Sequence, residues 1–308
     1  MRQKAIPEVL MPFLDGKLLL IDKPLQWTSF DIVNKIRYLI RVKKVGHAGT
    51  LDPLATGLLI VCTGKFTKQI NEYQGLPKEY TGTLVLGATT ASYDLETAPE
   101  NFKAISHLTE LEITNATLPF IGEILQMPPQ HSAIKKEGMR LYESARKGIE
   151  VKVDPRKVNI ISFEITNIHL PNIDFKVVCS TGTYIRSLVK DFGEALGVGA
   201  YMSALRRTKI GNLNVQDALS LDKIEALSTV KRIDFIKPTE VLVDEHPKII
   251  LNESEENLIK NGQPIKLPKK VNPEIYRLFS KNSAFIGLGE IDSNNLLKAV
   301  RLISTNLN

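Results

Sequence analysis

The sequence contains little cysteine and no long apolar segment. Its two cysteines, Cys62 and Cys179, both lie in apolar runs, so a disulfide framework and a cysteine-based zinc site are excluded and a reducing compartment is expected. No segment reaches the roughly 18 apolar residues that a membrane-spanning helix needs. The N-terminus begins with basic residues, but Pro7, Glu8 and Asp15 interrupt the segment after them, which makes a poor signal peptide. We therefore expect a soluble, cytoplasmic protein without a membrane partner.

Three common catalytic signatures are also missing. Residues 57–66 superficially resemble a phosphate-binding loop, but Leu59 stands where the first glycine is required and Phe66 replaces the Ser or Thr that would hold Mg²⁺. The sequence has no G-x-S-x-G elbow. His47 and Asp52 lack a third residue at metal-ligand spacing. Nucleotide hydrolysis, serine-hydrolase chemistry and a metal site are therefore not predicted.

The composition is that of an ordinary globular protein with a basic balance. The 308 residues are 43% apolar, and 40 Lys and Arg against 34 Asp and Glu give a net charge of +6. This moderate excess favours an acidic partner such as nucleic acid. The segment 35–44 carries much of this positive charge. It overlaps a predicted helix whose apolar face contains Phe30, Val33, Ile36 and Ile40. Charge alone leaves open whether this segment is a solvated face or a phosphate-binding surface.

The pattern of short elements predicts an α+β fold. Apolar or alternating runs indicate strands at 17–21, 58–62, 80–86 and 175–179, and a helix from 184 to 196 ends at Gly197. Because strands and helices mix without strict alternation, we expect a mixed or antiparallel central sheet. A linker near 237–247 separates two further strands, 276–279 and 284–290, from the rest. We therefore predict a large domain, 1–245, and a small β-rich domain, 246–308.

The segment 46–57 is the densest in unusual residues. It holds three glycines in addition to the pair Asp52-Pro53. Proline pushes the preceding residue out of the helical region, so the Asp52 carboxylate is held on a stiff loop beside a buried strand. Catalytic groups need such fixed placement, although a surface Asp-Pro turn has the same sequence.

Two other residues have both a structural and a functional interpretation. Tyr80, on a predicted strand, is either a core aromatic or a ring that stacks on a nucleic-acid base. Arg186 lies in the first turn of a predicted helix, where the helix dipole disfavours a cation, so it requires an anionic partner. That partner is either a structural carboxylate or a catalytic one, and Asp52 is a candidate.

Taken together, these motifs closely resemble those of the TruB family of pseudouridine synthases, over nearly the whole chain. The loop 46–57 is similar to the family's signature loop. Four further segments resemble, in order, its N-terminal motif, tyrosine motif, RNA-gripping insertion and arginine motif: Asp22-Lys23-Pro24, Lys78-Glu79-Tyr80, about 123–155 and 182–188. The region 285–290 resembles a PUA-like C-terminal domain. Five ordered motifs are far more specific than any one of them.

The resemblance implies a role for several residues. Asp52 matches the catalytic aspartate, Arg186 the arginine that pairs with it, and Tyr80 the tyrosine that stacks on the target uracil. The implied contacts with RNA come from residues in the loop, the insertion and other segments: His47, Tyr184, Leu205, Lys23, Lys135, Lys136, Arg206 and Arg207. Arg186 is expected to hold Asp52 by two parallel hydrogen bonds and to lower its pKa by roughly 1–3 units.

The implied reaction is the isomerisation of the T-loop uridine of tRNA to pseudouridine by a monomeric enzyme. Because no atoms are gained or lost, it needs no cofactor. Two alternatives remain open from the sequence: a guide-RNA-dependent relative that works inside a ribonucleoprotein, and a chaperone that binds and refolds tRNA without chemistry.

Overall fold

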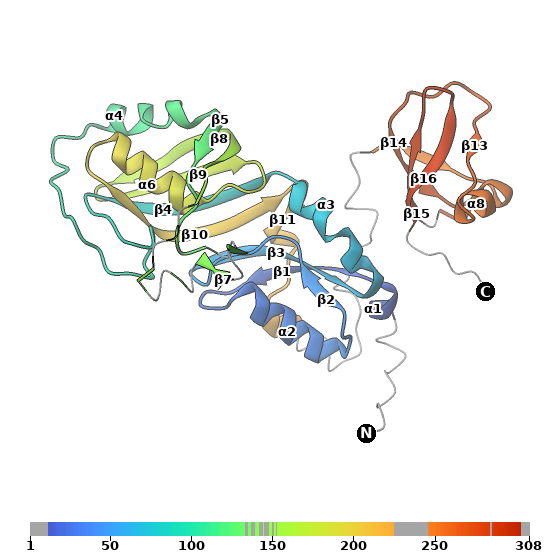
Figure 1. Cartoon of the computed structure of the whole chain (residues 1–308), viewed down its shortest axis with the longest axis horizontal. Coiled ribbons are helices and arrows are strands. Elements are labelled where there is room, and N and C mark those ends of the chain that lie inside the picture. Colours follow the sequence, from blue (N-terminus) through green and yellow to red (C-terminus); the bar gives the residue numbers. More distant parts are fainter. Residues whose placement is uncertain are drawn as a thin grey trace.

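The computed structural model describes residues 12–302, except 133–134, 137–138, 142–143, 145–147, 150, 152, 225–245 and 284. It contains a nine-stranded mixed sheet within residues 18–214 and a five-stranded sheet within 248–302 (Figure 1). The predicted α+β class with a second, β-rich unit is confirmed. The predicted boundary after residue 245 adjoins a segment outside the described residues, and it stays a prediction.

The large sheet brings sequence-distant segments side by side. Its order is β1 (Leu18–Lys23), β3 (Ala55–Thr63), β10 (Ala200–Ile210), β4 (Lys78–Leu86), β9 (Asn172–Cys179), β8 (Arg156–His169) and β5 (Gly122–Gln126), with β2 (Val45–His47) on β3 and β11 (Leu213–Asn214) on β10. The pair β3–β10 is parallel and its neighbours pair antiparallel. Strand β10 therefore connects the N-terminal segment to the rest of the sheet.

Strand β3 is apolar from Leu58 to Cys62 because both of its faces are covered there. Leu59 and Val61 pack under helix α2 (Ser29–Ile40), while Leu58 and Ile60 face η2 (Gly64–Gln69) and α3 (Ile70–Gly75). A strand buried on two faces gives a continuous apolar run rather than an alternating one. The run predicted at 58–62 thus lies at the centre of its part of the sheet.

Helix α2 starts at a capping box in which Thr28 and Asp31 exchange hydrogen bonds. Its inward stripe passes through Ile32, Val33, Ile36 and Ile40, all buried. The prediction that Phe30 belongs to this face is wrong, because Ser29 takes the inward position and leaves Phe30 62% exposed.

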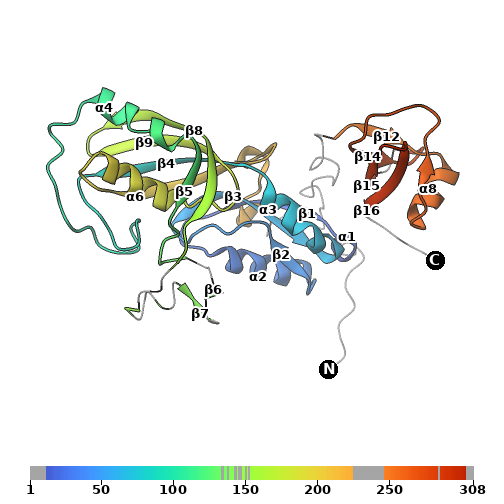
Figure 2. The same cartoon turned by 45° about the horizontal axis from the view of Figure 1, so that its top comes forward.

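Helix α6 (Ile185–Ala195) covers the other part of the sheet. Figure 2 shows α6 beside the strands of this part of the sheet. Leu188, Val189 and Phe192 of α6 belong to one apolar cluster with residues of β4, β9 and β10. The sequence predicted α6, β4 and β9, but not β8 or β10. The shorter elements of this unit are α1 (Pro12–Asp15), α4 (Glu110–Asn115), η3 (Leu118–Phe120) and η4 (Val215–Asp217).

The predicted insertion at about 123–155 begins with a strand of the large sheet. Residues 122–126 form β5, and all five of them pair with β8. Further on, β6 (Lys135–Lys136) and β7 (Met139–Arg140) form a short hairpin. Several residues between 133 and 152 lie outside the described part of the chain, as do the side chains of Lys135 and Lys136.

The second unit consists of β12 (Lys248–Ile250), β14 (Ile275–Phe279), β15 (Phe285–Ile291), β16 (Leu296–Leu302) and β13 (Ile265–Lys266), in that order, with helix α8 (Glu253–Lys260). It has its own apolar cluster, which includes Ile259, Leu278 and Leu297.

The close approach of β3 to β10 predicts a strong effect of one small substitution. Gly57 has φ +102°, and a Cβ there would overlap the backbone of Arg207. We expect Gly57→Ala to lower the free energy of unfolding by roughly 2–5 kcal/mol, through backbone strain and overpacking. Denaturant unfolding measures this. Gly75→Ala is the control, because a Cβ at Gly75 meets no atom within 4 Å, and equal stability of the two variants would contradict the argument.

Candidate active site

The loop before β3 fixes the backbone on both sides of Asp52. The Ser29 hydroxyl accepts a hydrogen bond from Leu51 N (2.8 Å) and lies 3.1 Å from Leu51 O. Ala55 N donates to Asp52 O over 3.0 Å, and Gln26 N donates to Pro53 O over 2.8 Å. Because residues 26–29 and the start of β3 both hold it, this short loop presents its carboxylate in one place.

Two buried cations lie under this loop. The Arg207 guanidinium, 1% exposed, donates to Leu58 O (2.7 Å) and Gly49 O (3.0 Å). The Lys23 ammonium is fully buried and donates to Trp27 O (2.6 Å). The RNA contacts of Lys23 and Arg207 stay a prediction; in this structure both side chains are buried, and their donors bind the protein's own carbonyl groups. Burial lowers the pKa of Lys23 to about 8, although the nearby carboxylate of Asp52 opposes the shift.

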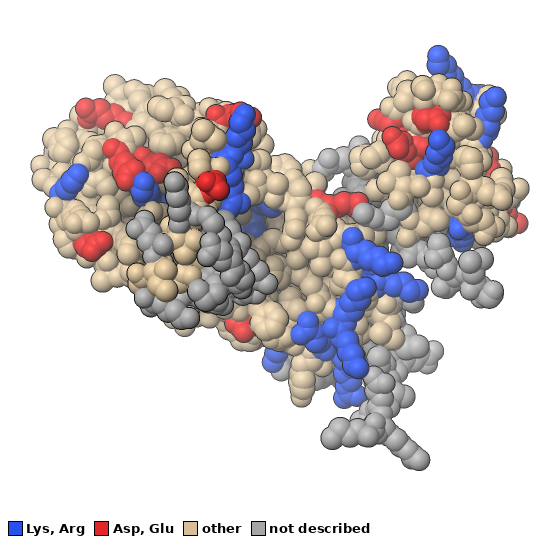
Figure 3. Space-filling view, viewed as in Figure 1, with Lys and Arg blue, Asp and Glu red and all other residues tan. Residues whose placement is uncertain are grey.

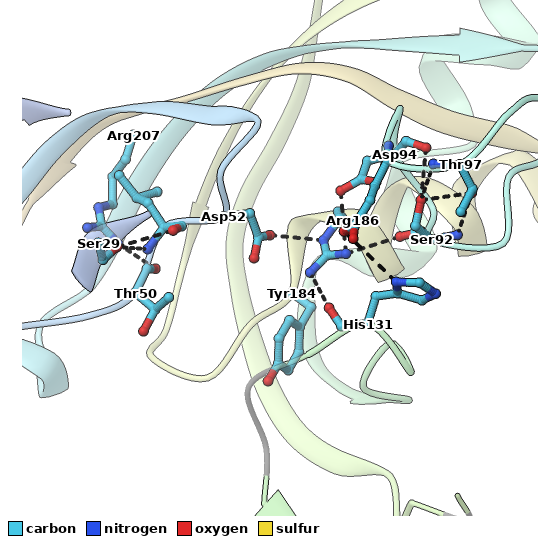
Figure 4. Close-up of polar contacts among 12 residues, drawn as sticks. Ser29, Thr50, Asp52, Ser92, Asp94, Thr97, His131, Tyr184, Arg186 and Arg207 are labelled. Carbon is cyan, nitrogen blue, oxygen red and sulfur yellow. Dashed lines mark hydrogen bonds and ion pairs between the residues drawn. The ribbon is translucent and has the colours of Figure 1, made fainter. Parts of the chain in front are cut away.

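Asp52 meets Arg186 of helix α6, as the sequence predicted (Figure 4). Arg186 Nε lies 2.9 Å from Asp52 Oδ2, and the arginine side chain is 3% exposed. The expected pair of parallel hydrogen bonds is absent between these two residues, because the terminal nitrogens have other partners. One donates to Ser92 O (3.1 Å) and the other to His131 O (2.8 Å). The Nε–H is poorly aligned for a hydrogen bond to the carboxylate, so the contact is an ion pair.

A second carboxylate on the same guanidinium was not among the residues predicted from the sequence. Asp94 Oδ2 lies 3.4 Å from Arg186 NH1, and its side chain is 4% exposed. Its loop is held by its own polar side chains: the Thr90 hydroxyl donates to Asp94 O (2.8 Å), and Glu96 N donates to Asp94 Oδ1 (3.0 Å). The signal in the sequence is a cluster of hydroxyl residues and one aspartate at 89–94, which is also typical of an ordinary turn.

The charges around Asp52 act in opposite directions on its pKa. Burial among protein atoms raises the pKa of Asp52, the Arg186 guanidinium lowers it, and the Asp94 carboxylate raises it further, so that the net direction is upward. Arg186 thus acts on the pKa of Asp52 in the predicted direction, but burial outweighs it. The side chain nevertheless remains 37% exposed. The carboxylate is thus open to a ligand from one side while protein surrounds the others.

Tyr80 and Leu205 reach this region through the sheet. Leu205 of β10 is in register with Ala55 of β3, and Arg207 is in register with Tyr80 of β4. Tyr80 and Leu205 are nearly buried, at 8% and 7% exposure, in the apolar cluster that contains Leu51. Burial raises the pKa of Tyr80 although Arg207 opposes the shift, so the phenol is neutral at physiological pH.

The other residues predicted to contact RNA differ in their charge and in their partners within the protein. Burial and the charge of Arg207 lower the pKa of His47, so its imidazole is neutral. Tyr184 precedes α6, and both of its backbone polar groups bond to the Gln126 side chain (2.7 and 3.0 Å). Arg206 lines a cavity of about 620 Å³ together with Leu205, but Asp22 binds its guanidinium through two hydrogen bonds of 2.7 and 3.0 Å.

Within the described residues, no group of three or more His, Cys, Asp or Glu side chains is arranged to hold a metal ion. In the same part of the chain, no helix is both long and apolar enough to cross a membrane.

Comparison with known proteins gives three matching family models. "TruB family pseudouridylate synthase (N terminal domain)" matches residues 37–185. "tRNA pseudouridylate synthase B C-terminal domain" matches 186–244, and "Pseudouridine synthase II TruB, C-terminal" matches 247–303. The matches together cover residues 37–303 except 245 and 246.

Curated relatives and solved structures agree with these models. A tRNA pseudouridine synthase B of Flavobacterium johnsoniae is 56% identical over 69% of this chain and 96% of its own length. One of Clostridium kluyveri is 41% identical over 90% of this chain and 95% of its own. A chain of an H/ACA ribonucleoprotein bound to a substrate RNA shares the fold, with TM-score 0.71 and 22% identity over 96% of this chain and 87% of that chain.

The two carboxylates on Arg186 predict a change in the titration of Asp52. Replacing Asp94 by Asn removes a negative charge that raises the pKa of Asp52, so this pKa should fall, by up to about one unit. Titration of the Asp52 carboxyl carbon by NMR measures the change. Asp191→Asn is the control, because Asp191 pairs with Lys190 on the outer side of α6. An unchanged or raised pKa in Asp94→Asn would contradict the electrostatic argument.

Proposed function

Since the chain belongs to the TruB family of pseudouridine synthases, we propose that it converts the T-loop uridine of tRNA to pseudouridine at Asp52. The enzyme is an isomerase of the tRNA pseudouridine synthase class. The observation that carries the assignment of the site is the ion pair between Asp52 and Arg186, which leaves one side of the carboxylate open.

The reaction exchanges one bond of the nucleoside for another. The bond between C1′ of the ribose and N1 of uracil breaks, the base turns, and C1′ bonds to C5. The proton on C5 is lost to solvent and N1 gains one, so atoms balance without a second reactant. The active site must hold the detached base and direct a carboxylate at it or at the sugar.

Asp52 supplies that carboxylate. An aspartate can attack the sugar, attack the base or remove a proton, and each of these roles requires the ionised form. Arg186 provides the positive charge that favours this form, against burial and Asp94. Because the pKa of Asp52 is raised, the rate should increase with pH as the carboxylate loses its proton.

Tyr80 and Leu205 form the apolar part of the proposed uridine site. A base stacked inside an RNA loop cannot reach Asp52, so the uridine must be extruded at a cost of a few kcal/mol. Stacking on an aromatic ring returns roughly 1–3 kcal/mol per base. Tyr80 is a neutral phenol in the cluster that contains Leu51, beside the loop of Asp52. His47, neutral as well, suits a site for bases rather than for phosphate groups.

The proposed partner is the T-stem-loop of tRNA, recognised mainly by its folded shape. We propose that one copy of the chain acts as a monomer in the cytoplasm, where tRNA is modified. We also propose residues 1–245 as the catalytic domain and 246–308 as a PUA-like domain, with Lys135 and Lys136 of the hairpin β6–β7 as contacts to phosphate.

The decisive test separates chemistry from binding. We expect Asp52→Asn to bind a T-stem-loop transcript with near-normal affinity but to release tritium from 5-tritiated uridine at least about 1,000-fold more slowly. The assay contains purified protein and this RNA alone, so product from the wild type distinguishes a stand-alone synthase from a guide-dependent one. Asp191→Asn serves as a control with wild-type rate. A loss of rate in Asp52→Asn much smaller than this would reject the role of Asp52, and binding without product by the wild type would indicate an RNA chaperone.

A further inference from the structure

A basic surface lies at the end of β3 that is remote from Asp52. Two segments, 41–44 after α2 and 65–68 in η2, meet there. Gly64 N donates to Lys44 O over 2.7 Å, and Val45 of β2 is in register with Thr63 of β3. We call the cations of these two segments the far-end patch: Arg41, Lys43, Lys44, Lys65 and Lys68.

Four cations of the far-end patch, all except Lys65, have no carboxylate partner in the described part of the chain. Between residues 37 and 71 the sequence contains six basic residues and one acidic residue, and that acidic residue is Asp52. In the described part of the chain, no carboxylate lies within ion-pair distance of Arg41, Lys43, Lys44 or Lys68. Figure 3 shows Lys and Arg side chains gathered on this face of the large unit. Such a concentration of one sign attracts polyanions.

The backbone under the patch is held in place by the protein. Arg37, whose donors are directed inward, bonds through Nε to Lys43 O (3.1 Å) and through NH2 to Val45 O (3.3 Å). The segment 41–44 is therefore held by a half-buried arginine whose hydrogen bonds go to backbone carbonyls. A patch on a rigid backbone loses less conformational entropy when it binds than one on a free loop.

Two features beside the patch fit a nucleic acid better than a simple solvated face. Tyr38 is 79% exposed and lies three residues before Arg41, so both side chains project from the same end of α2. Arg41 adopts a left-handed conformation with φ +53°, which glycine occupies at less cost. An exposed aromatic ring among cations is typical of RNA-binding surfaces.

The position of the patch determines which part of an RNA it can reach. Strand β3 has nine residues and rises about 3.3 Å per residue, so its far end lies roughly 26 Å from the loop of Asp52. A uridine at Asp52 therefore leaves the patch out of reach of the nucleotides next to that uridine, so an RNA that touches both must extend along the large unit.

We propose that the far-end patch binds the sugar–phosphate backbone of tRNA outside the T-stem-loop. The proposal rests on the proposed function, because it takes a tRNA uridine at Asp52 as its starting point. The patch supplies affinity for the intact tRNA through charge, and it takes no part in the chemistry.

The test compares two RNAs and two double variants. Lys43→Gln/Lys68→Gln removes two charges of the patch, and Lys103→Gln/Lys157→Gln removes two charges elsewhere that already have protein partners. For full-length tRNA we expect the patch variant to bind roughly three- to tenfold more weakly. Its slope of log affinity against log salt should become shallower by about 1–2. Its affinity for an isolated T-stem-loop should be unchanged, as should both affinities of the control variant.

A single substitution provides an independent check on folding. Arg41→Gly removes a charge and relieves the left-handed strain, so its melting temperature should not fall, whereas its affinity for full-length tRNA should fall about two- to threefold.

Unchanged tRNA affinity in the folded patch variants overturns the proposal. An equal loss for both RNAs also overturns it, since the contact would then be with the T-arm. Loss of binding to anionic lipid vesicles with tRNA binding intact would assign the surface to a membrane and overturn it too. Absence of pseudouridine from the wild type rejects only the proposed function, because the binding comparison still tests the patch.

Discussion

The contact between Asp52 and Arg186 joins the two halves of the large sheet. Asp52 belongs to the loop before β3, and Arg186 to the helix that covers β4, β9 and β10. They meet because β10 pairs with β3 on one side and with β4 on the other. The guanidinium is fixed on its remaining sides by Ser92, Asp94 and His131, so the arginine presents one face to Asp52. The geometry of the site thus depends on the pairing of three strands that are distant in sequence.

Two buried cations, Lys23 and Arg207, stabilise the loop that carries Asp52. Lys23 donates to Trp27 O in the neighbouring segment, and Arg207 donates to Gly49 O in the loop of Asp52 and to Leu58 O of β3, so both stabilise this region and place positive charge near the carboxylate. The charge of Lys23 favours an anionic Asp52, and the charge of Arg207 favours a neutral His47. The carboxylate is thus subject to a balance in which burial and Asp94 favour the protonated form, whereas Arg186 favours the ionised form. Small changes in this network shift the protonation of Asp52.

Local chemistry explains which parts could be predicted from the sequence. A cation in the first turn of a helix requires an anion, and this argument pointed from Arg186 to Asp52. The apolar run of β3 and the Asp-Pro loop were equally local signals. By contrast, the sequence shows that Lys23 and Arg207 are basic but not that they are buried, because burial is set by strand pairing over long separations. Asp94 was missed for the same reason, since a turn rich in Ser, Thr and Asp has no signal for the partner across the sheet. Strand β5 was missed because its partner, β8, was not recognised either.

The separation of buried and exposed cations bears on how such a protein binds RNA. The basic side chains in the motifs nearest to Asp52 are largely occupied within the fold: Arg186 by carboxylates and carbonyls, Lys23 and Arg207 by carbonyls, Arg206 by Asp22. They order the site but offer little attraction to phosphate groups. Attraction at long range depends on cations whose field reaches solvent, and on the large unit these include the far-end patch. The two groups of cations occupy opposite ends of β3. The residues that order the carboxylate can therefore vary independently of those that attract a polyanion. The net charge of +6 does not distinguish one group from the other.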